Sequence, residues 1–296
     1  GIALCEEEFT ADLDRRRAGA AGTTPRKEGD VPHIVSGLYN GYTTGSPLTI
    51  EFVNENTRSG DYKNLISHPR PSHADWVAQK KWNGYNDPRG GGHFSGRITL
   101  GLVAAGVVAK KILGQSVEFS TEITEIGSER NKEKFAEIIE QARMAQDSVG
   151  GVVECRVKGV DVGLGEPFFD SAESLIAHLL FSVPAVKGVE FGDGFEVARK
   201  RGSQNNDCII SAEGQTATNH AGGIVGGITN GNEIVVRAAV KPTPSISCEQ
   251  QTYNFESGSV EPLIIKGRHD VCITLRAAVV IESAIAIALA ELKLRA

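Results

Sequence analysis

Five short segments of the 296-residue chain concentrate residue types that bind anions and transfer protons. Arg15–Arg17 are consecutive arginines, and a guanidinium binds a carboxylate or phosphate through two parallel hydrogen bonds. Arg70–Trp76 contains His73, which can move a proton near neutral pH, and Asp75 is close enough in sequence to orient its ring. Lys266–Asp270 is a dense cluster of titratable groups. These three segments suit an anionic ligand and proton transfer.

Each of these segments also has a structural interpretation, which the residues alone leave open. Three adjacent arginines cannot share one helical face, so a solvated surface is as well supported as an anion clamp. His73 would serve equally well as the cap of a turn. Charges of both signs within 266–270 are typical of a surface turn, although Gly267 before Arg268 favours a shaped loop.

The other two segments are rich in glycine. Gly90–Gly92 precede an apolar run, and backbone N–H groups at the N-terminus of a helix favour an anion. The segment matches neither G-x-x-x-x-G-K-[ST] nor G-x-G-x-x-G, so those standard nucleotide sites are not supported. Asn219–Gly231 holds two glycine pairs, which suit either a flat ligand on exposed backbone or the tight packing of two strands.

Composition excludes several classes of protein. The net charge of −6 disfavours a general nucleic-acid binder, which needs a basic face. The most apolar run, Ala277–Leu292, is interrupted by Glu282 and Ser283, so no membrane span is predicted. The five cysteines are widely spaced without a C-x-x-C, which indicates neither disulfides nor a metal site. No secretory leader is visible, and a reducing cytoplasm is expected.

The elements that must position these segments alternate between helix and strand. Residues 1–30 predict a short helix and then a mobile loop, and the nearly all-apolar run 99–113 predicts a helix buried between other layers. Such a pattern is typical of an α/β or α+β layered domain, and the lack of a linker favours one domain over 1–296. Further helices are predicted at 129–148, 171–181 and 279–292, and strands at 33–38, 47–53, 152–160, 185–191 and 233–239.

Nine motifs in this order carry a resemblance to a known family. They are LDRRR (13–17), RPSHADW (70–76), RGGGHFSGR (89–97), GLGEP (163–167), VKGVEFGDGF (186–195), RGSQNND (201–207), NHAGGIVGGITNG (219–231), KPTPSI (241–246) and KGRHDVC (266–272). Together they resemble chorismate synthase, the last enzyme of the shikimate pathway, over nearly the whole chain.

The resemblance implies both a fold and an activity. The fold would be a single-domain α+β protein, a β-α-β sandwich with helices packed between antiparallel sheets, assembled as a homotetramer. The activity would be the anti-1,4-elimination of phosphate from 5-enolpyruvylshikimate 3-phosphate to give chorismate. It would require bound reduced FMN, and NADPH would be the flavin reductant in members that reduce their own flavin.

The resemblance also implies roles for individual residues. By position, His73 would protonate the reduced flavin and Asp270 would help flavin N5 accept the substrate proton. Arg16, Arg17 and Arg97 would bind the substrate, with Arg16 also matching an NADPH contact. FMN would contact His93, Phe94, Ser95, Pro184, Ala185, Gly226, Lys241, Pro242, Thr243, Pro244, Ser245 and Arg268.

Three departures from the family pattern bear on these expectations. Many members have GGGRSSAR where this chain has GGGHFSGR, so His93 replaces an arginine beside the flavin. The loop after Arg17 is one residue shorter and has Gly22 where an arginine is usual, which weakens an NADPH site. Gly1 aligns inside the pattern, so the GESHG segment with a second catalytic histidine is not in this sequence. The alternative expectation is a catalytically impaired homotetramer that binds flavin and phosphate.

Overall fold

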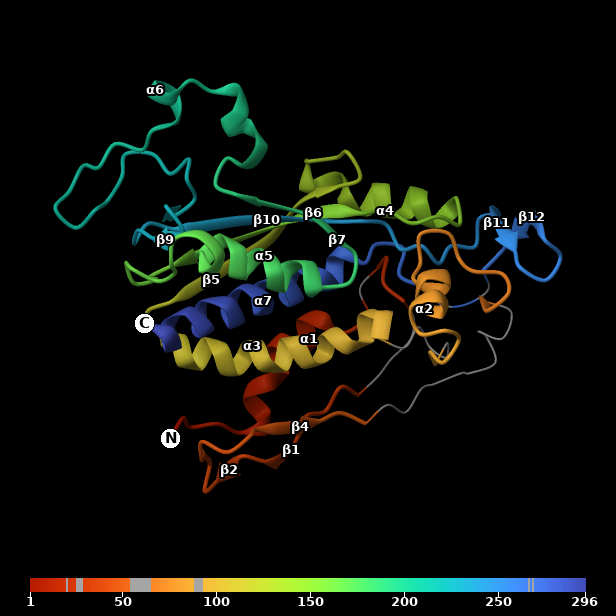
Figure 1. Cartoon of the computed structure of the whole chain (residues 1–296), viewed down its shortest axis with the longest axis horizontal. Coiled ribbons are helices and arrows are strands. Elements are labelled where there is room, and N and C mark those ends of the chain that lie inside the picture. The colour runs from red at the N-terminus through yellow and green to blue at the C-terminus, as the bar shows by residue number, and fades with distance from the viewer. Residues whose placement is uncertain (20, 25–28, 54–64, 88–92, 266, 268) are drawn as a thin grey trace.

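The chain folds as α+β, with a layer of helices between antiparallel sheets (Figure 1). The computed structural model describes residues 1–19, 21–24, 29–53, 65–87, 93–265, 267 and 269–296. A four-stranded sheet lies on one side of the helices and short two-stranded sheets from the N-terminal part of the chain lie on the other. This arrangement confirms the predicted class and the predicted sandwich of helices between sheets.

The four-stranded sheet has one face packed on the helices. Its strand order is β5 (Glu118–Ile126), β6 (Gly151–Lys158), β10 (Ile234–Val240) and β7 (Val186–Phe191), with every neighbouring pair antiparallel. Val153, Cys155 and Val157 alternate along β6 and are fully buried, because successive side chains of a strand point to opposite faces. On the other face of the sheet, Glu154 accepts from Arg237 at 3.4 Å.

Two long helices form the centre of the core. α3 (Thr99–Leu113) packs along α7 (Thr274–Arg295), and α5 (Ala172–Ser182) packs on α7 as well. The first two cross where side chains are small: a Cβ added to Gly106 would lie 2.4 Å from the Cβ of Ser283. The buried helix predicted at 99–113 is confirmed, and its small residues allow the close approach.

The N-terminal part of the chain covers the other side of the helices. A 3₁₀ turn, η1 (Glu6–Phe9), leads into α1 (Thr10–Arg16). This helix is the short helix predicted within residues 1–30. The predicted strands 33–38 and 47–53 are each shorter in the structure. The pairs are β1 (His33–Ser36) with β4 (Thr49–Glu51), and β2 (Leu38–Tyr39) with β3 (Tyr42–Thr43).

Two predicted helices have different limits. The helix expected at 129–148 is the shorter α4 (Phe135–Met144), preceded by η5 (Lys132–Lys134). It begins later than predicted because Ile126 and Glu129 form a β-bridge and the side chain of Asn131 accepts from the Glu133 N–H. The last helix begins at Thr274 rather than at 279. The predicted strands 152–160, 185–191 and 233–239 and the helix 171–181 are confirmed to within a few residues.

Several elements carry no clear periodicity and are absent from the prediction. They are β5, α2 (Asp75–Lys81), η4 (Gly96–Ile98), η6 (Phe168–Asp170), η7 (Gly194–Arg199), α6 (Gly202–Asn205), β8 (Ile224–Val225), β9 (Ile228–Thr229), β11 (Gln250–Asn254) and β12 (Ser259–Leu263). In β5 polar residues occupy most positions, because much of the strand stays accessible at the edge of the sheet. Figure 1 shows α6 on an arm that extends away from the sheet.

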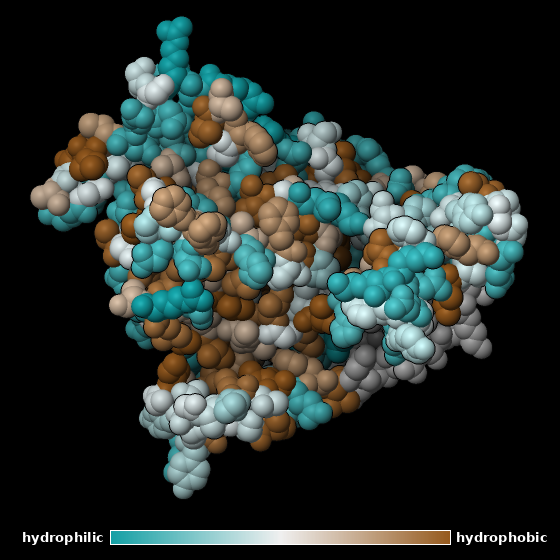
Figure 2. Space-filling model, viewed as in Figure 1, coloured by the Kyte–Doolittle hydropathy of each residue, from teal (hydrophilic) through white to brown (hydrophobic). Residues whose placement is uncertain are grey.

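The surface is uneven in polarity. In Figure 2 apolar residues gather over the layer of helices, whereas the arm that carries α6 mixes hydrophilic and apolar residues. Phe168, Phe169 and Phe181 are among the exposed large apolar side chains. Among the described helices, none combines the length and apolar character that crossing a bilayer requires.

Candidate active site

A cavity of about 510 Å³ lies where several elements end or begin. Its walls include the end of α1, the segment 93–99 at the start of α3, the start of α7, the end of α5 and the segment that follows β10. Two helices therefore begin at this cavity, and the N-terminus of a helix carries partial positive charge. The backbone itself favours an anion here.

Most of the residues predicted for the site line this one cavity. They are Arg16, Arg17, His73, His93, Phe94, Ser95, Arg97, Pro184, Ala185, Lys241, Thr243, Pro244, Ser245 and Asp270. Pro242 and Gly226 are not among the lining residues. Arg268 and the triple glycine at 90–92 lie outside the described residues. Segments more than 200 residues apart in sequence thus meet at one place.

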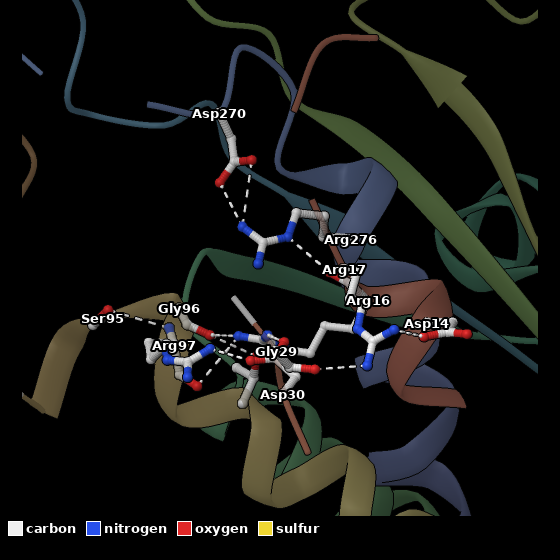
Figure 3. Close-up of polar contacts among 11 residues, drawn as sticks. Asp14, Arg16, Arg17, Gly29, Asp30, Ser95, Gly96, Arg97, Asp270 and Arg276 are labelled. Carbon is white, nitrogen blue, oxygen red and sulfur yellow. Dashed lines mark hydrogen bonds and ion pairs between the residues drawn. The ribbon is translucent and has the colours of Figure 1, made fainter. Parts of the chain in front are cut away.

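The carboxylate of Asp30 holds two of the predicted arginines (Figure 3). Arg16 is only 2 % exposed; its Nη1 lies 3.4 Å from Asp30 Oδ2, its Nε donates to Thr99 Oγ1 at 3.1 Å and its Nη2 to the Gly96 carbonyl at 2.9 Å. Arg97 donates from Nη1 to the other oxygen of Asp30. Burial and the nearby guanidinium of Arg276 lower the pKa of Arg16 to about 10.

The third arginine, Arg17, points elsewhere. Its Nη2 donates to the Gly29 carbonyl at 2.6 Å and its Nη1 pairs with Asp14. Its Nε is buried and has no hydrogen-bond partner among the described residues. Arg15, by contrast, turns away from the cavity and binds Glu282. Arg16 and Arg17 therefore line the cavity, each paired with a carboxylate of the chain, while the partly exposed Arg15 lies outside it. The anion-clamp interpretation stays a prediction.

Asp270 is held from two sides. Its Oδ1 accepts from the Thr24 N–H at 2.8 Å, and its Oδ2 accepts from Arg276 Nη1 at 3.1 Å. Arg276 also donates from Nε to the Arg16 carbonyl at 2.8 Å, so Figure 3 shows it between Asp270 and the end of α1. The segment 266–270 is thus a shaped loop at its described positions.

His73 belongs to a compact charged group at the start of α2. Its Nδ1 lies 2.7 Å from Asp75 Oδ1 and 3.0 Å from Arg70 Nη2. Arg70 binds both oxygens of Asp75, at 2.7 and 2.8 Å, and reaches Ser245 Oγ at 3.0 Å. Burial alone would raise the pKa of Asp75, but these hydrogen bonds outweigh it and hold the pKa well below its usual range.

The segment 241–245 supplies a cation and hydroxyl groups. Lys241 Nζ donates to the Ser72 carbonyl at 2.6 Å, and burial together with the charge of Lys187 lowers the pKa of this amine. The Lys241 N–H donates to the carbonyl of Ala185, whose φ is +78°. Thr243 Oγ1 is buried without a hydrogen-bond partner in the described part of the chain.

The glycine pairs at 219–231 serve backbone packing rather than this cavity. A Cβ on Gly222 would lie 2.3 Å from the Gly192 nitrogen, and one on Gly223 would lie 2.7 Å from the Glu233 carbonyl oxygen. Gly226 differs, because it lies in the turn between β8 and β9 with φ +64° and nothing within 4 Å of an added Cβ. The close-packing interpretation therefore holds for Gly222 and Gly223.

Three charged residues of the cavity were not predicted. Asp30 and Arg276 stand in no glycine-rich or histidine motif, so no local signal marks them. Arg70 lies within the RPSHADW motif, three residues before His73, and that proximity could have identified it. All three bind residues that sequence analysis did select.

The cavity carries an excess of positive charge. Its lining includes six cationic side chains (Arg16, Arg17, Arg70, Arg97, Lys241 and Arg276) and two carboxylates (Asp30 and Asp270). Two carboxylates outside the lining, Asp14 and Asp75, pair with Arg17 and Arg70. Three histidines also line the cavity (His73, His93 and His269). Such a fold and site define an α+β protein with one cavity lined mainly by cationic side chains.

Comparison with known proteins specifies this class further. The model of the family described as Chorismate synthase matches residues 1–294. A chorismate synthase of Chitinophaga pinensis is 58 % identical over 294 residues, which cover 99 % of this chain and 88 % of that protein. One of Korarchaeum cryptofilum is 44 % identical over 319 residues, covering 98 % and 88 %.

A solved structure agrees with the sequence comparisons. A crystal structure of chorismate synthase superposes with a TM-score of 0.72 at 27 % identity, covering 99 % of this chain and 84 % of the other. The chain therefore belongs to the chorismate synthase family, which makes it a lyase. The resemblance carried by the nine motifs is confirmed, and the impaired binding protein is not favoured.

Proposed function

We propose that the chain catalyses the anti-1,4-elimination of phosphate from 5-enolpyruvylshikimate 3-phosphate to give chorismate, as a carbon–oxygen lyase acting on phosphates. The single observation that carries this proposal is that six cationic side chains line one cavity and outnumber the two carboxylates of its lining. The substrate has a phosphate and two carboxylates, and guanidinium groups bind both kinds of anion. The two helix N-termini add to this preference.

The proton-transfer groups of the proposal are His73 and Asp270. Nδ1 of His73 is engaged by the protein, 2.7 Å from Asp75 Oδ1 and 3.0 Å from Arg70 Nη2, so Nε2 is the ring nitrogen proposed to exchange a proton with a ligand. The Asp270 carboxylate is fixed by Thr24 and Arg276 at the cavity wall. A general acid or base held in this way contributes typically 10²–10⁴-fold to a rate.

Reduced FMN is the proposed cofactor, and the cavity fits it. A cavity of about 510 Å³ is in the usual range for a ligand of this size. Phe94 and Pro184 offer apolar surface to a flat ring, and the buried Thr243 Oγ1 and Arg17 Nε offer polar atoms without partners among the described residues. When bound, reduced FMN supplies electron density to the ring from which phosphate leaves.

A flavin-binding test follows from Thr243. Because its Oγ1 is buried and has no partner in the described part of the chain, Thr243→Val should not lower the free energy of unfolding, since Val loses no hydrogen bond there. Loss of one hydrogen bond to FMN should raise the FMN dissociation constant about tenfold. Fluorescence titration of FMN measures this, and an unchanged dissociation constant would remove Thr243 from the flavin site.

NADPH as the flavin reductant, with Arg16 as a contact, stays a prediction. The Arg16 guanidinium is enclosed, and each of its nitrogens bonds inside the protein. Contact with a second ligand would need these bonds to rearrange. Steady-state reduction of FMN by NADPH, followed anaerobically, tests whether the protein reduces its own flavin.

We also propose a homotetramer, one domain over residues 1–296 and a cytoplasmic location. Exposed apolar side chains over the helices, Phe181 among them, support burial between copies of the chain. One hydrophobic cluster that joins α1, α3, α5, α7 and the large sheet supports a single domain. Five cysteines with free thiols suit a reducing compartment. Analytical ultracentrifugation tests the tetramer.

The decisive experiment is an anaerobic assay with chemically reduced FMN and 5-enolpyruvylshikimate 3-phosphate. Phosphate release and chorismate absorbance are followed together, and equal rates of both are expected. Flavin and substrate binding without either product would refute the lyase and support the catalytically impaired homotetramer.

A further inference from the structure

We infer that Arg276 is a positioning residue, which holds the Asp270 carboxylate and the end of α1 in one fixed arrangement. This inference rests on the proposed function, because it assigns Asp270 a part in the elimination. Arg276 lies in the first turn of α7, six residues after Asp270. Its side chain is 21 % exposed and that of Asp270 is 13 % exposed, so the pair is largely shielded from solvent.

The contacts of Arg276 divide between two elements. Nη1 donates to Asp270 Oδ2 at 3.1 Å and lies 3.4 Å from Oδ1. Nε donates to the carbonyl of Arg16 at 2.8 Å. That carbonyl belongs to the last residue of α1, where a helix leaves carbonyls without a partner in the next turn and where a cation is stabilising. One guanidinium therefore ties the candidate acid–base residue to the arginine-rich segment.

The backbone around Asp270 completes the arrangement. The Thr24 N–H donates to Asp270 Oδ1 at 2.8 Å, and the N–H groups of Val271 and Cys272 both donate to the Gly22 carbonyl, at 3.0 and 3.1 Å. The two bonds to Gly22 fix the backbone that directly follows Asp270. Among the described residues, Arg276 is the group that binds Oδ2, whereas the Thr24 N–H binds Oδ1.

Removing a positioning residue and removing a substrate-binding residue change different kinetic constants. Nε and Nη1 of Arg276 both bond to the protein, so the chain itself holds the guanidinium in place. Displacement of a catalytic group by about 1 Å can cost about 100-fold in rate. Removal of Arg276 should therefore lower kcat rather than raise KM.

The test compares Arg276→Ala with Arg276→Lys and with Arg295→Ala in the elimination assay. Arg295 is the matched control, since it is an exposed arginine at the other end of α7 that pairs with Glu291. We expect kcat of R276A to fall about 10- to 100-fold, with KM within about threefold, and R295A to match the wild type. Millimolar guanidinium should restore part of the activity of R276A, and R276K should retain more activity than R276A.

A second readout does not depend on activity. The Thr24 amide should exchange with deuterium faster in R276A and R276K than in the wild type, because Asp270 loses its second anchor, while amides of α3 stay protected. If R276A does not fold, the deuterium exchange of the Thr24 amide in R276K still decides the test.

Distinct results would overturn the inference. A kcat of R276A within twofold of the wild type, or a loss confined to KM, would show that Arg276 does not position Asp270. If the wild type itself gives no chorismate, the proposed function fails. In that case the deuterium exchange of the Thr24 amide tests only whether Arg276 holds Asp270 in place. An exchange rate in the variants equal to that of the wild type would then overturn the inference.

Discussion

Glu282 should be the most sensitive charge in the core. It lies in the middle of α7, is 3 % exposed, and receives Arg15 on both oxygens at 2.7 Å. Lys110 of α3 donates to it at 2.6 Å and to Asp12 of α1 also at 2.6 Å. One carboxylate thus links α1, α3 and α7. We predict that Glu282→Gln destabilises the whole helical layer.

The magnitude follows from the pKa of this carboxyl group. Burial opposes ionisation, but hydrogen bonds from Arg15 and the charge of Lys110 outweigh it and lower the pKa of Glu282 from 4.5 to about 2. Each pKa unit corresponds to about 1.4 kcal/mol, so the charged form contributes about 3 kcal/mol of stability. Removing one partner of a buried ion pair typically costs about 3–5 kcal/mol, which agrees.

The pH dependence has a definite sign. Because the pKa of Glu282 is lower in the folded chain than in the unfolded one, its stabilisation is complete above about pH 5 and is lost as the pH falls from about 4.5 toward 2. The difference between wild type and E282Q should therefore be constant near neutrality and should shrink below about pH 4.5.

Urea unfolding at one fixed protein concentration measures this difference. Glu291→Gln is the matched control, because Glu291 lies on the same helix in an exposed pair with Arg295, and such pairs contribute less than about 1 kcal/mol. A difference between E282Q and wild type of less than about 1 kcal/mol at pH 7, or one that does not shrink in acid, would refute the reasoning.

Three further substitutions test the site and the fold. His73→Ala should lower kcat at least about 100-fold with an unchanged near-ultraviolet circular dichroism spectrum, and full activity would remove His73 from the mechanism. Asp30→Asn should cost about 3 kcal/mol in urea unfolding, because Arg16 stays buried without a counter-charge; a neutral effect would contradict this account. Gly222→Ala should lower the melting temperature more than Gly41→Ala does. Both glycines have positive φ, but only at Gly222 does the new Cβ meet backbone, 2.3 Å from the Gly192 nitrogen. Equal decreases in melting temperature would show that the positive φ alone determines the loss of stability.

Strong local patterns predicted much of the fold. The apolar run 99–113 is the helix α3 at the predicted limits, because a helix buried on all sides needs apolar residues all round. The predicted helix limits are wrong where contacts outside the helix determine its ends. Residues 129–131 form a bridge and a cap instead of helix, and the polar residues of β5 follow from its edge position.

The sequence by itself determined the family and most of the cavity-lining residues, since these stand in dense local motifs. Only the tertiary structure decided where two consecutive arginines point: Arg15 to Glu282 and Arg16 to Asp30. The physical reason is that a helix turns each successive side chain by about 100°. Which partner each one meets then depends on elements that are distant in sequence. Glu282 lies 267 residues from Arg15, and no local pattern records that contact.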